Sequence, residues 1–170
     1  MKEKLGVDVG GVIIDAVRND NTDTSFLSDN YLTTTAVPDA FNSLRHLVGS
    51  RFHENVFVVS KCGPVVEDKT RRWFTHHHFH ERTGILEGHI RFCRKRPDKE
   101  PICKSIGITH FVDDRIDVLL YLSGTVPHLY LFNPEPQAIE YAHQRGIIPV
   151  TGWKEVLSAL ANTKETVEAR

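Results

Sequence analysis

Short apolar runs alternate along the chain with segments whose apolar residues recur at helical spacing. Val56-Phe57-Val58-Val59 is a continuous run of β-branched and aromatic residues, typical of a strand buried on both faces. After Pro38, residues Phe41, Leu44 and Leu47 fall on one helical face. The pattern predicts strands at 5–9, 56–59, 89–93, 110–112, 128–132 and 147–150, and helices from about 38 and at 65–77, 99–105, 116–122, 137–144 and 153–161.

This alternation of strands and helices predicts right-handed βαβ units. We therefore expect an α/β fold, a three-layer α/β/α sandwich around a Rossmann-like parallel sheet. The polar stretch 15–35 is predicted to be mostly loop. Residues 1–162 are expected to form a single domain, followed by a frayed C-terminal tail at 163–170.

Composition and charge narrow the possible functions. The 170 residues include 21 Lys and Arg against 22 Asp and Glu, so the formal charge of −1 argues against a dedicated nucleic-acid-binding surface. No apolar run approaches the roughly 20 residues that span a bilayer, and the N-terminus lacks a signal-peptide pattern. Cys62, Cys93 and Cys103 form no C-x-x-C pair and suggest neither disulfides nor a zinc ribbon. A cytoplasmic protein without membrane partners is therefore expected.

Polar residues follow several of the predicted strands. Asp8 and Ser60 each end an apolar run, and Lys99 begins the helix before the fourth strand. Ligands of open parallel sheets bind beyond the carboxyl ends of the strands, so these side chains are candidates for one site. Gly10-Gly11 would let the chain turn sharply and point backbone N–H groups at an anion. The alternatives are that Asp8 only caps a turn and that Ser60 only caps a helix.

The adjacent carboxylates Asp113 and Asp114 follow the fourth predicted strand, with Asp117 shortly after them. Two adjacent carboxylates repel each other, and a divalent cation is their natural neutraliser. Mg²⁺ prefers one or two carboxylates together with waters and a substrate phosphate. As an alternative, Asp114 would supply the N-cap of the next helix, although that explains only one of the two residues.

The order Asp, Ser, Lys, Asp-Asp resembles the four motifs of the haloacid-dehalogenase (HAD) superfamily over nearly the whole chain. The matching segments are LGVDVGGVIID, NVFVVS, DKEPICKSIGI and THFVDDRID. The resemblance implies a HAD-like phosphohydrolase in which Asp8 becomes an aspartyl-phosphate with the help of Lys99. It further implies Mg²⁺ as the cofactor, a phosphate site that includes Ser60, Lys61, Gly10 and Gly11, and a metal site made of Asp8, Gly10, Asp113, Asp114 and Asp117.

One position departs from the pattern of the phosphatases. They usually read Asp-x-Asp in the first motif, and the second Asp moves the proton of the leaving group; here that residue is Gly10. Loss of a general acid typically costs about 10²–10⁴ in rate. Members similar to the phosphatase-like domain of epoxide hydrolases also read Asp-x-Gly. Three outcomes stay open: hydrolysis of esters with good leaving groups, replacement of the acid by Asp15 or a histidine, or binding of a phosphorylated ligand without turnover.

The chain is also too short between its motifs for a large cap domain. An uncapped site is open to bulky or macromolecular phosphorylated substrates, with the polar loop 20–35 as a small flap. The alternative functions are a non-catalytic phosphate-binding or regulatory module and, less favoured, a dehalogenase, which needs no metal and so has no use for Asp113-Asp114. The oligomeric state is left open.

Three further features have simpler interpretations. His76 and His80 stand four residues apart and would suit one metal ion on a helix, but no matching carboxylate or Cys completes a site, and a structural role is favoured. Cys62 has no base beside it and is taken as incidental. Trp153 is expected to pack against the sheet.

Overall fold

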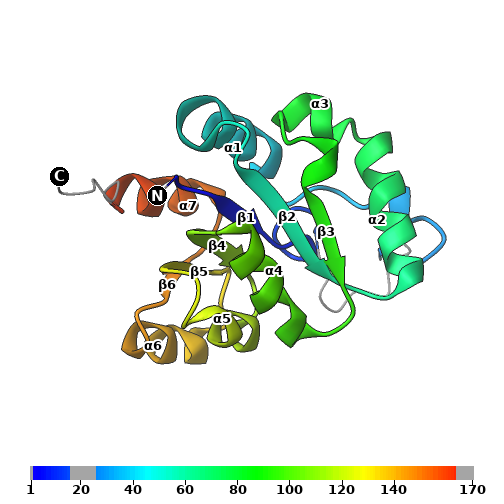
Figure 1. Cartoon of the computed structure of the whole chain (residues 1–170). Coiled ribbons are helices and arrows are strands. Elements are labelled where there is room, and N and C mark those ends of the chain that lie inside the picture. Colours follow the sequence, from blue (N-terminus) through cyan, green and yellow to red (C-terminus); the bar gives the residue numbers. More distant parts are fainter. Residues whose placement is uncertain (1, 16–25, 164–170) are drawn as a thin grey trace.

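The computed structural model describes residues 2–15 and 26–163, which form a six-stranded sheet flanked by helices (Figure 1). The strand order is β3-β2-β1-β4-β5-β6, and every neighbouring pair is parallel. Each predicted strand is present. The strands are β1 (Leu5–Val7), β2 (Val56–Lys61), β3 (Ile90–Cys93), β4 (His110–Asp113), β5 (His128–Phe132) and β6 (Ile148–Val150).

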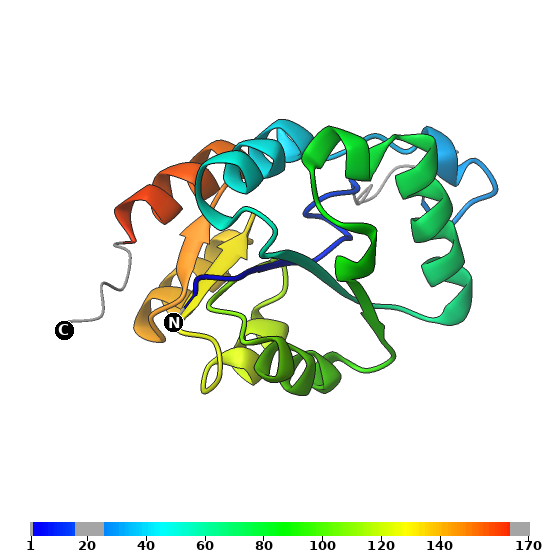
Figure 2. The ribbon, with the colours of Figure 1, turned by 45° about the horizontal axis from the view of Figure 1, so that its top comes forward.

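The helices form a layer on each face of this sheet (Figure 2). One layer contains α1 (Ala40–Leu47), α2 (Pro64–His76), α3 (Phe79–Thr83) and α7 (Trp153–Asn162). The other contains α4 (Lys99–Ile106), α5 (Ile116–Leu122) and α6 (Pro136–Gln144). The three-layer α/β/α architecture predicted from the alternating pattern is therefore confirmed.

Alternation along the strands divides the core into two parts. Val56 and Val58 of β2 pack with α1 and α2, whereas Phe57 and Val59 face the layer of α4 and α5. Successive side chains of a strand point to opposite faces, so a strand buried on both sides must be apolar throughout. This explains the continuous apolar run at β2.

Within the described residues, no helix is long and apolar enough to cross a membrane.

The first strand is shorter than predicted and ends at Val7 rather than at residue 9. The carbonyl oxygen of Val9 accepts hydrogen bonds from the N–H groups of Val12, Ile13 and Ile14, at 3.2, 2.8 and 3.1 Å. A residue whose carbonyl closes such a turn no longer belongs to the sheet ladder. The chain therefore turns back immediately after Asp8.

The short helix α3 was not among the elements predicted from the sequence pattern. His78 adopts a left-handed conformation that separates α2 from α3, and the buried Phe79 anchors the new helix in the core. Gly84 then ends α3 in a left-handed conformation. Burial of one aromatic side chain thus overrides the weak local pattern.

Both tryptophans tie loops near β1 to the helical layer. Trp153 is buried, as expected, and its Nε1 donates to the carbonyl oxygen of Val12 at 2.7 Å. Trp73 of α2 donates to the carbonyl oxygen of Thr34 at 2.9 Å. At the C-terminus, the Thr163 N–H still bonds to Ala159, and the rest of the predicted tail lies outside the described residues.

Candidate active site

The polar residues predicted to form a site converge at the carboxyl edge of the sheet. β1 pairs with β2 on one side and with β4 on the other, so the connections run in opposite directions from this point. Asp8 directly follows β1, Ser60 lies near the end of β2, and Asp113 ends β4. This is the switch point at which open parallel sheets bind ligands.

Lys99, the first residue of α4, joins two of these strands through its side chain. Its Nζ donates to Asp8 Oδ1 at 2.9 Å and to Asp113 Oδ2 at 2.8 Å, and only 2% of Lys99 is exposed. Burial disfavours the charged ammonium, but the carboxylates of Asp8 and Asp113 outweigh that cost and raise the pKa of Lys99. Lys99 is therefore a fixed positive charge beneath the site.

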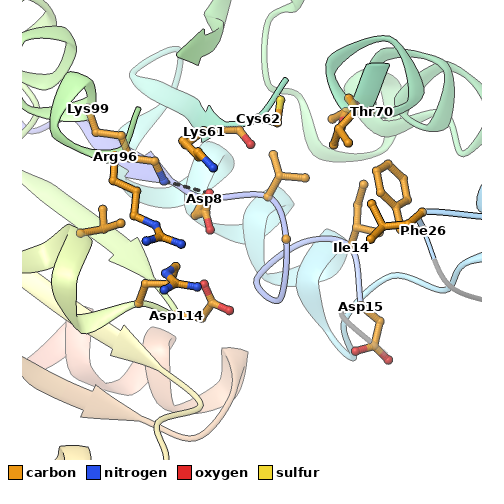
Figure 3. A pocket seen from close by; sticks show the side chains of 17 residues that line it. Asp8, Ile14, Asp15, Phe26, Lys61, Cys62, Thr70, Arg96, Lys99 and Asp114 are labelled. Atoms are coloured by element: carbon orange, nitrogen blue, oxygen red, sulfur yellow. Dashed lines mark hydrogen bonds and ion pairs between the residues drawn. The ribbon is translucent and has the colours of Figure 1, made fainter. Parts of the chain in front are cut away.

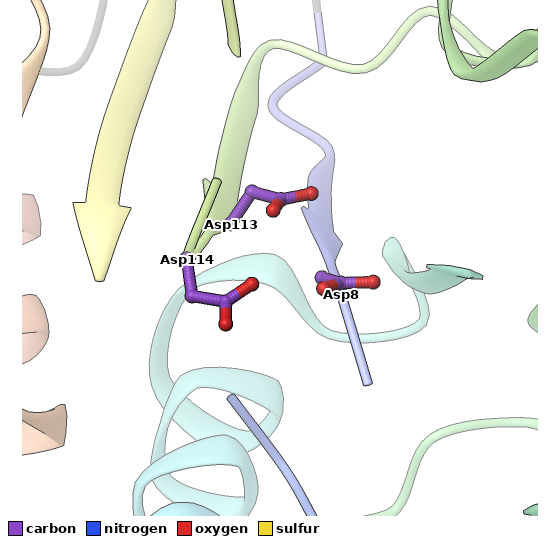
Figure 4. Close-up of side chains that lie close together, drawn as sticks. All are labelled: Asp8, Asp113 and Asp114. Carbon is purple, nitrogen blue, oxygen red and sulfur yellow. The ribbon is translucent and has the colours of Figure 1, made fainter. Parts of the chain in front are cut away.

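Three carboxylates surround this lysine. Asp8, Asp113 and Asp114 each offer one oxygen, and the three oxygens lie within 4.8 Å of one another (Figure 4). Burial, with the nearby Asp8 carboxylate, raises the pKa of Asp113 above its usual range, although Lys99 acts in the opposite direction. The cluster brings three carboxylates close to one ammonium, so negative groups outnumber positive groups within it. Hard oxygen donors and this charge suit Mg²⁺.

The two adjacent aspartates have different surroundings. Asp113 is fully buried, and its Oδ1 accepts the backbone N–H of Arg115 at 3.0 Å. Asp114 is partly exposed and lines the cavity above Asp8. Arg115, rather than Asp114, occupies the N-cap position of α5, and no side chain caps that helix. The alternative that Asp114 is an N-cap is therefore wrong.

The cavity at this edge has a volume of about 390 Å³ (Figure 3). Asp113 lies below the cavity wall, and Gly11 lines a neighbouring depression. Asp117 also lies to one side, in another depression. The predicted site residues that line the cavity itself are Asp8, Gly10, Ser60, Lys61, Lys99 and Asp114.

Asp117 is not part of the carboxylate cluster. Its Oδ2 lies 3.2 Å from Arg96 Nη1, and its Oδ1 lies 3.2 Å from Arg115 Nε. Both arginines line the cavity. The structure thus places Asp117 as a bridge between two guanidinium groups, away from the position expected of a metal ligand.

Sequence reasoning missed Arg96, which belongs to a run of basic residues between Arg91 and Lys99 and was not named as a site residue. The signal was its position three residues before Lys99, because a short turn at Arg96–Asp98 leads directly into α4. Sequence reasoning also missed an apolar side of the cavity, although Phe26-Leu27 interrupts an otherwise polar stretch. That side is formed by Ile14, Phe26, Leu27, Val66 and Thr70.

Among the described residues that line the cavity, none is a well-placed substitute for the missing acid at Gly10. No histidine is among the described residues that line it. Asp15 lies at the far end from Asp8, and Figure 3 shows its carboxylate pointing away from the centre. Burial raises the pKa of the Cys62 thiol, which keeps it protonated and supports the view that it is incidental.

The histidines of the 76–80 segment serve the fold. His77 Nε2 lies 2.8 Å from the carbonyl oxygen of Leu32, and the ring stacks on Trp73 at 4.0 Å between centroids. His80 Nδ1 lies 2.8 Å from the carbonyl oxygen of Ile85. Among the described residues, the only cluster of potential metal ligands is the aspartate cluster. The structural interpretation of these histidines is therefore the better supported one.

Gly11 is the glycine on which the site geometry depends. It has a φ of +77°, and a Cβ there would lie 2.4 Å from Asp114 Oδ2. At Gly10 nothing lies within 4 Å of the corresponding position. We expect Gly11→Ala to displace Asp114 and to lower stability by about 1–3 kcal/mol, since it combines backbone strain with a clash. Gly10→Ala is the matched control and should change the melting temperature little; equal effects of the two substitutions would contradict this geometry.

Comparison with known proteins agrees with the fold. No protein-family model and no curated protein sequence matches this chain. Among solved structures, it is similar to D,D-heptose 1,7-bisphosphate phosphatase from Burkholderia thailandensis, with a TM-score of 0.55 and 13% identity over 96% of this chain and 100% of that chain.

A second similar structure is the HAD domain of effector protein Lem4 from Legionella pneumophila, with a TM-score of 0.47 and 13% identity over 95% of this chain and 94% of that chain. At such identities the comparison bears on the fold alone, and the first of these structures carries it. The α/β fold that the resemblance to the HAD superfamily implied is thus confirmed.

Proposed function

We propose that this protein is a Mg²⁺-dependent phosphohydrolase that cleaves a phosphate monoester through an aspartyl-phosphate on Asp8. The observation that carries the proposal is the placement of the Asp8 carboxylate. It stands at the switch point of the sheet, bonded to a buried ammonium and open to a cavity lined by further cations. The fold shared with a sugar bisphosphate phosphatase is consistent with this chemistry.

Each residue at the site has a separate role in the proposed reaction. Lys99 holds Asp8 Oδ1, which leaves Oδ2 to attack phosphorus. That attack forms the Asp8–phosphorus bond and breaks the bond from phosphorus to the ester oxygen, which takes the electron pair. Ser60 and Lys61 line the same cavity and would bind the phosphoryl oxygens. Water then attacks phosphorus, and the bond to Asp8 breaks to regenerate the carboxylate and release phosphate.

The fixed cation beneath Asp8 orients the nucleophile. Lys99 bonds to Asp8 and Asp113 simultaneously and is almost fully buried, so its side chain has little freedom to rotate. A preorganised charge of this kind stabilises the negative charge of the transition state without reorganisation. Lys99 therefore fits the role of a catalytic electrostatic group as well as that of a phosphate ligand.

Asp8, Asp113 and Asp114 are the residues that would hold Mg²⁺. Their nearest oxygens lie within 4.8 Å, close to the roughly 4 Å between opposite ligands of one Mg²⁺ ion. The ion would offset charge on the phosphoryl group. The backbone carbonyl of Gly10, next to Asp8 in the cavity, is a further candidate ligand. Asp117 is left out of this proposal because two arginines hold its carboxylate.

Phosphate release with and without Mg²⁺ tests the proposed reaction. We expect para-nitrophenyl phosphate and acyl phosphates to be hydrolysed, because their leaving groups depart without a proton from residue 10. Asp8→Asn should abolish turnover, since it removes the nucleophile. Asp68→Asn, which changes a surface carboxylate paired with Arg72, is the control and should retain activity. Activity that survives in Asp8→Asn would refute the proposal.

Mg²⁺ should also stabilise the folded protein. A ligand that binds only the native state adds about 2.7 kcal/mol when present at one hundred times its dissociation constant. We expect millimolar Mg²⁺ to raise the melting temperature of the wild type. Asp114→Asn should reduce this response, because it removes one of the clustered carboxylates, whereas Asp68→Asn should leave it intact. A melting temperature that does not change when Mg²⁺ is added would contradict the proposed metal site.

A non-catalytic phosphate-binding module is the second candidate, and Gly10 is the observation that favours it. The described residues that line the cavity offer no well-placed acid in place of the missing one. If the wild type binds phosphate-containing ligands but releases no phosphate from any activated ester, this second function is the correct one. A dehalogenase fits less well, because a reaction without metal has no need of the Asp113-Asp114 pair.

A further inference from the structure

The cavity above Asp8 has two chemically different sides. Figure 3 shows Lys99, Arg96 and Asp114 on one side of Asp8, and Ile14, Phe26 and Thr70 on the other. Leu27 and Val66 add to the second side, and Asp15 lies at its far end. A phosphate bound at Asp8 would therefore have cations on one side and a mostly apolar wall on the other.

The apolar wall is held in place by the protein itself. Lys69 of α2 donates from Nζ to the carbonyl oxygens of Leu27, at 3.0 Å, and Ser28, at 3.1 Å. The same ammonium lies 5.1 Å from the ring centroid of Tyr31, whose ring meets Phe26 edge-on at 6.0 Å. These contacts fasten the segment at Phe26 and Leu27 to α2, on the same side of the cavity as Val66.

The wall offers little to a polar substrate. The hydroxyl of Thr70 already donates to the carbonyl oxygen of Val66 at 2.8 Å. Leu27 is 74% exposed at the rim, and an exposed apolar side chain beside a binding cavity gains by covering an apolar ligand. Sugar hydroxyls placed here would lose hydrogen bonds to water without replacing them.

On the basis of the proposed phosphohydrolase function, we propose that the substrate is an aryl phosphate, whose ring packs on the wall formed by Ile14, Phe26, Leu27 and Val66. The phosphoryl group lies at Asp8, and the bridging oxygen departs as an aryl oxide when the phosphorus–oxygen bond breaks. An aryl oxide is a far more stable anion than an alkoxide, so it leaves without the proton that Gly10 does not provide. The wall and the missing acid therefore favour the same class of substrate.

Binding of two phosphonates to the full chain in Mg²⁺ separates this proposal from the proposed function. Benzylphosphonate copies phenyl phosphate with a methylene in place of the bridging oxygen, and methylphosphonate lacks the ring. Calorimetry should show benzylphosphonate binding about tenfold more tightly, as expected for partial burial of one aromatic ring. Phosphate release from para-nitrophenyl phosphate is measured in parallel.

Two substitutions test whether the wall is responsible. Leu27→Ser and Val66→Thr should each reduce the preference for benzylphosphonate severalfold while leaving the affinity for methylphosphonate unchanged. Both side chains are at least partly exposed, so the fold should tolerate the changes. Leu86→Ser is the matched control, because Leu86 is 50% exposed and precedes β3 at the opposite edge of the sheet.

Equal affinity for the two phosphonates in a protein that releases phosphate would overturn the aryl proposal alone. A preference that persists unchanged in both wall variants would also overturn it. If neither phosphonate binds and no ester is hydrolysed, the aryl proposal and the proposed function fail together. A preference that falls in the wall variants but not in Leu86→Ser supports the proposal.

Discussion

Gly10→Asp is expected to raise the rate of hydrolysis of alkyl phosphates by up to about 10²–10⁴, the usual contribution of a general acid. The structure makes this test practical, because nothing lies within 4 Å of a Cβ at Gly10 and its φ lies outside the left-handed region. Gly10 also lines the cavity next to Asp8, so a carboxyl group there is close to the leaving oxygen. Rates are compared for alkyl phosphates and para-nitrophenyl phosphate.

The size of the gain should depend on the leaving group. The para-nitrophenolate leaving group of para-nitrophenyl phosphate departs without a proton. Gly10→Asp should therefore change the rate of hydrolysis of this ester far less than that of an alkyl ester. Gly10→Asn is the matched control, since it has the same shape but cannot donate a carboxyl proton. If both variants fold and accelerate alkyl esters equally, protonation does not limit the wild type. If neither the wild type nor a folded Gly10→Asp releases phosphate from any activated ester, the binding-module function replaces catalysis.

The architecture was predictable because the central strands β1, β2 and β4 are buried almost throughout. Such strands must be apolar at every position, which marks them as short continuous runs in the sequence. The matches are close: the predicted 116–122 and 128–132 coincide with Ile116–Leu122 and His128–Phe132. Where the prediction failed, long-range contacts decide the structure. The helix Phe79–Thr83 depends on burial of Phe79 against α1 and α2, which no local pattern reveals.

The site was predictable to the extent that strand ends define it. Asp8, Ser60 and Asp113 follow apolar strands, and the rule for parallel sheets brings strand ends together. The surroundings of Asp117 were not predictable, because its partner Arg96 comes from another part of the chain. The apolar wall of the cavity could not be predicted for the same reason, because residues 14, 26–27 and 66 come together only in the folded chain.

Lys99→Met is expected to lower the free energy of unfolding by about 3–5 kcal/mol at a pH above the raised pKa of Asp113, about 8, as is typical when one partner of a buried ion pair is removed. The loss should be large because Asp113 is fully buried and its charge partner is Lys99 Nζ, which lies 2.8 Å from Asp113 Oδ2. For a chain of this size the melting temperature should fall by on the order of 10 °C. Lys104→Met, on the exposed side of the same helix, is the control.

The pH dependence of Lys99→Met distinguishes an electrostatic cause from a packing defect. Burial already raises the pKa of Asp113, and loss of the lysine should raise it further. A carboxyl group with a higher pKa in the folded state binds more protons there than in the unfolded chain, so acidification stabilises the fold. Because the pKa of Asp113 in the wild type is already raised to about 8, the defect in Lys99→Met should be largest above pH 8 and shrink as the pH falls through 8 towards neutral, and adding Asp113→Asn should restore much of the stability. A defect that is independent of pH and is not relieved by Asp113→Asn would mean that Lys99 acts through packing alone, and Lys99 would then no longer qualify as the fixed charge that orients Asp8.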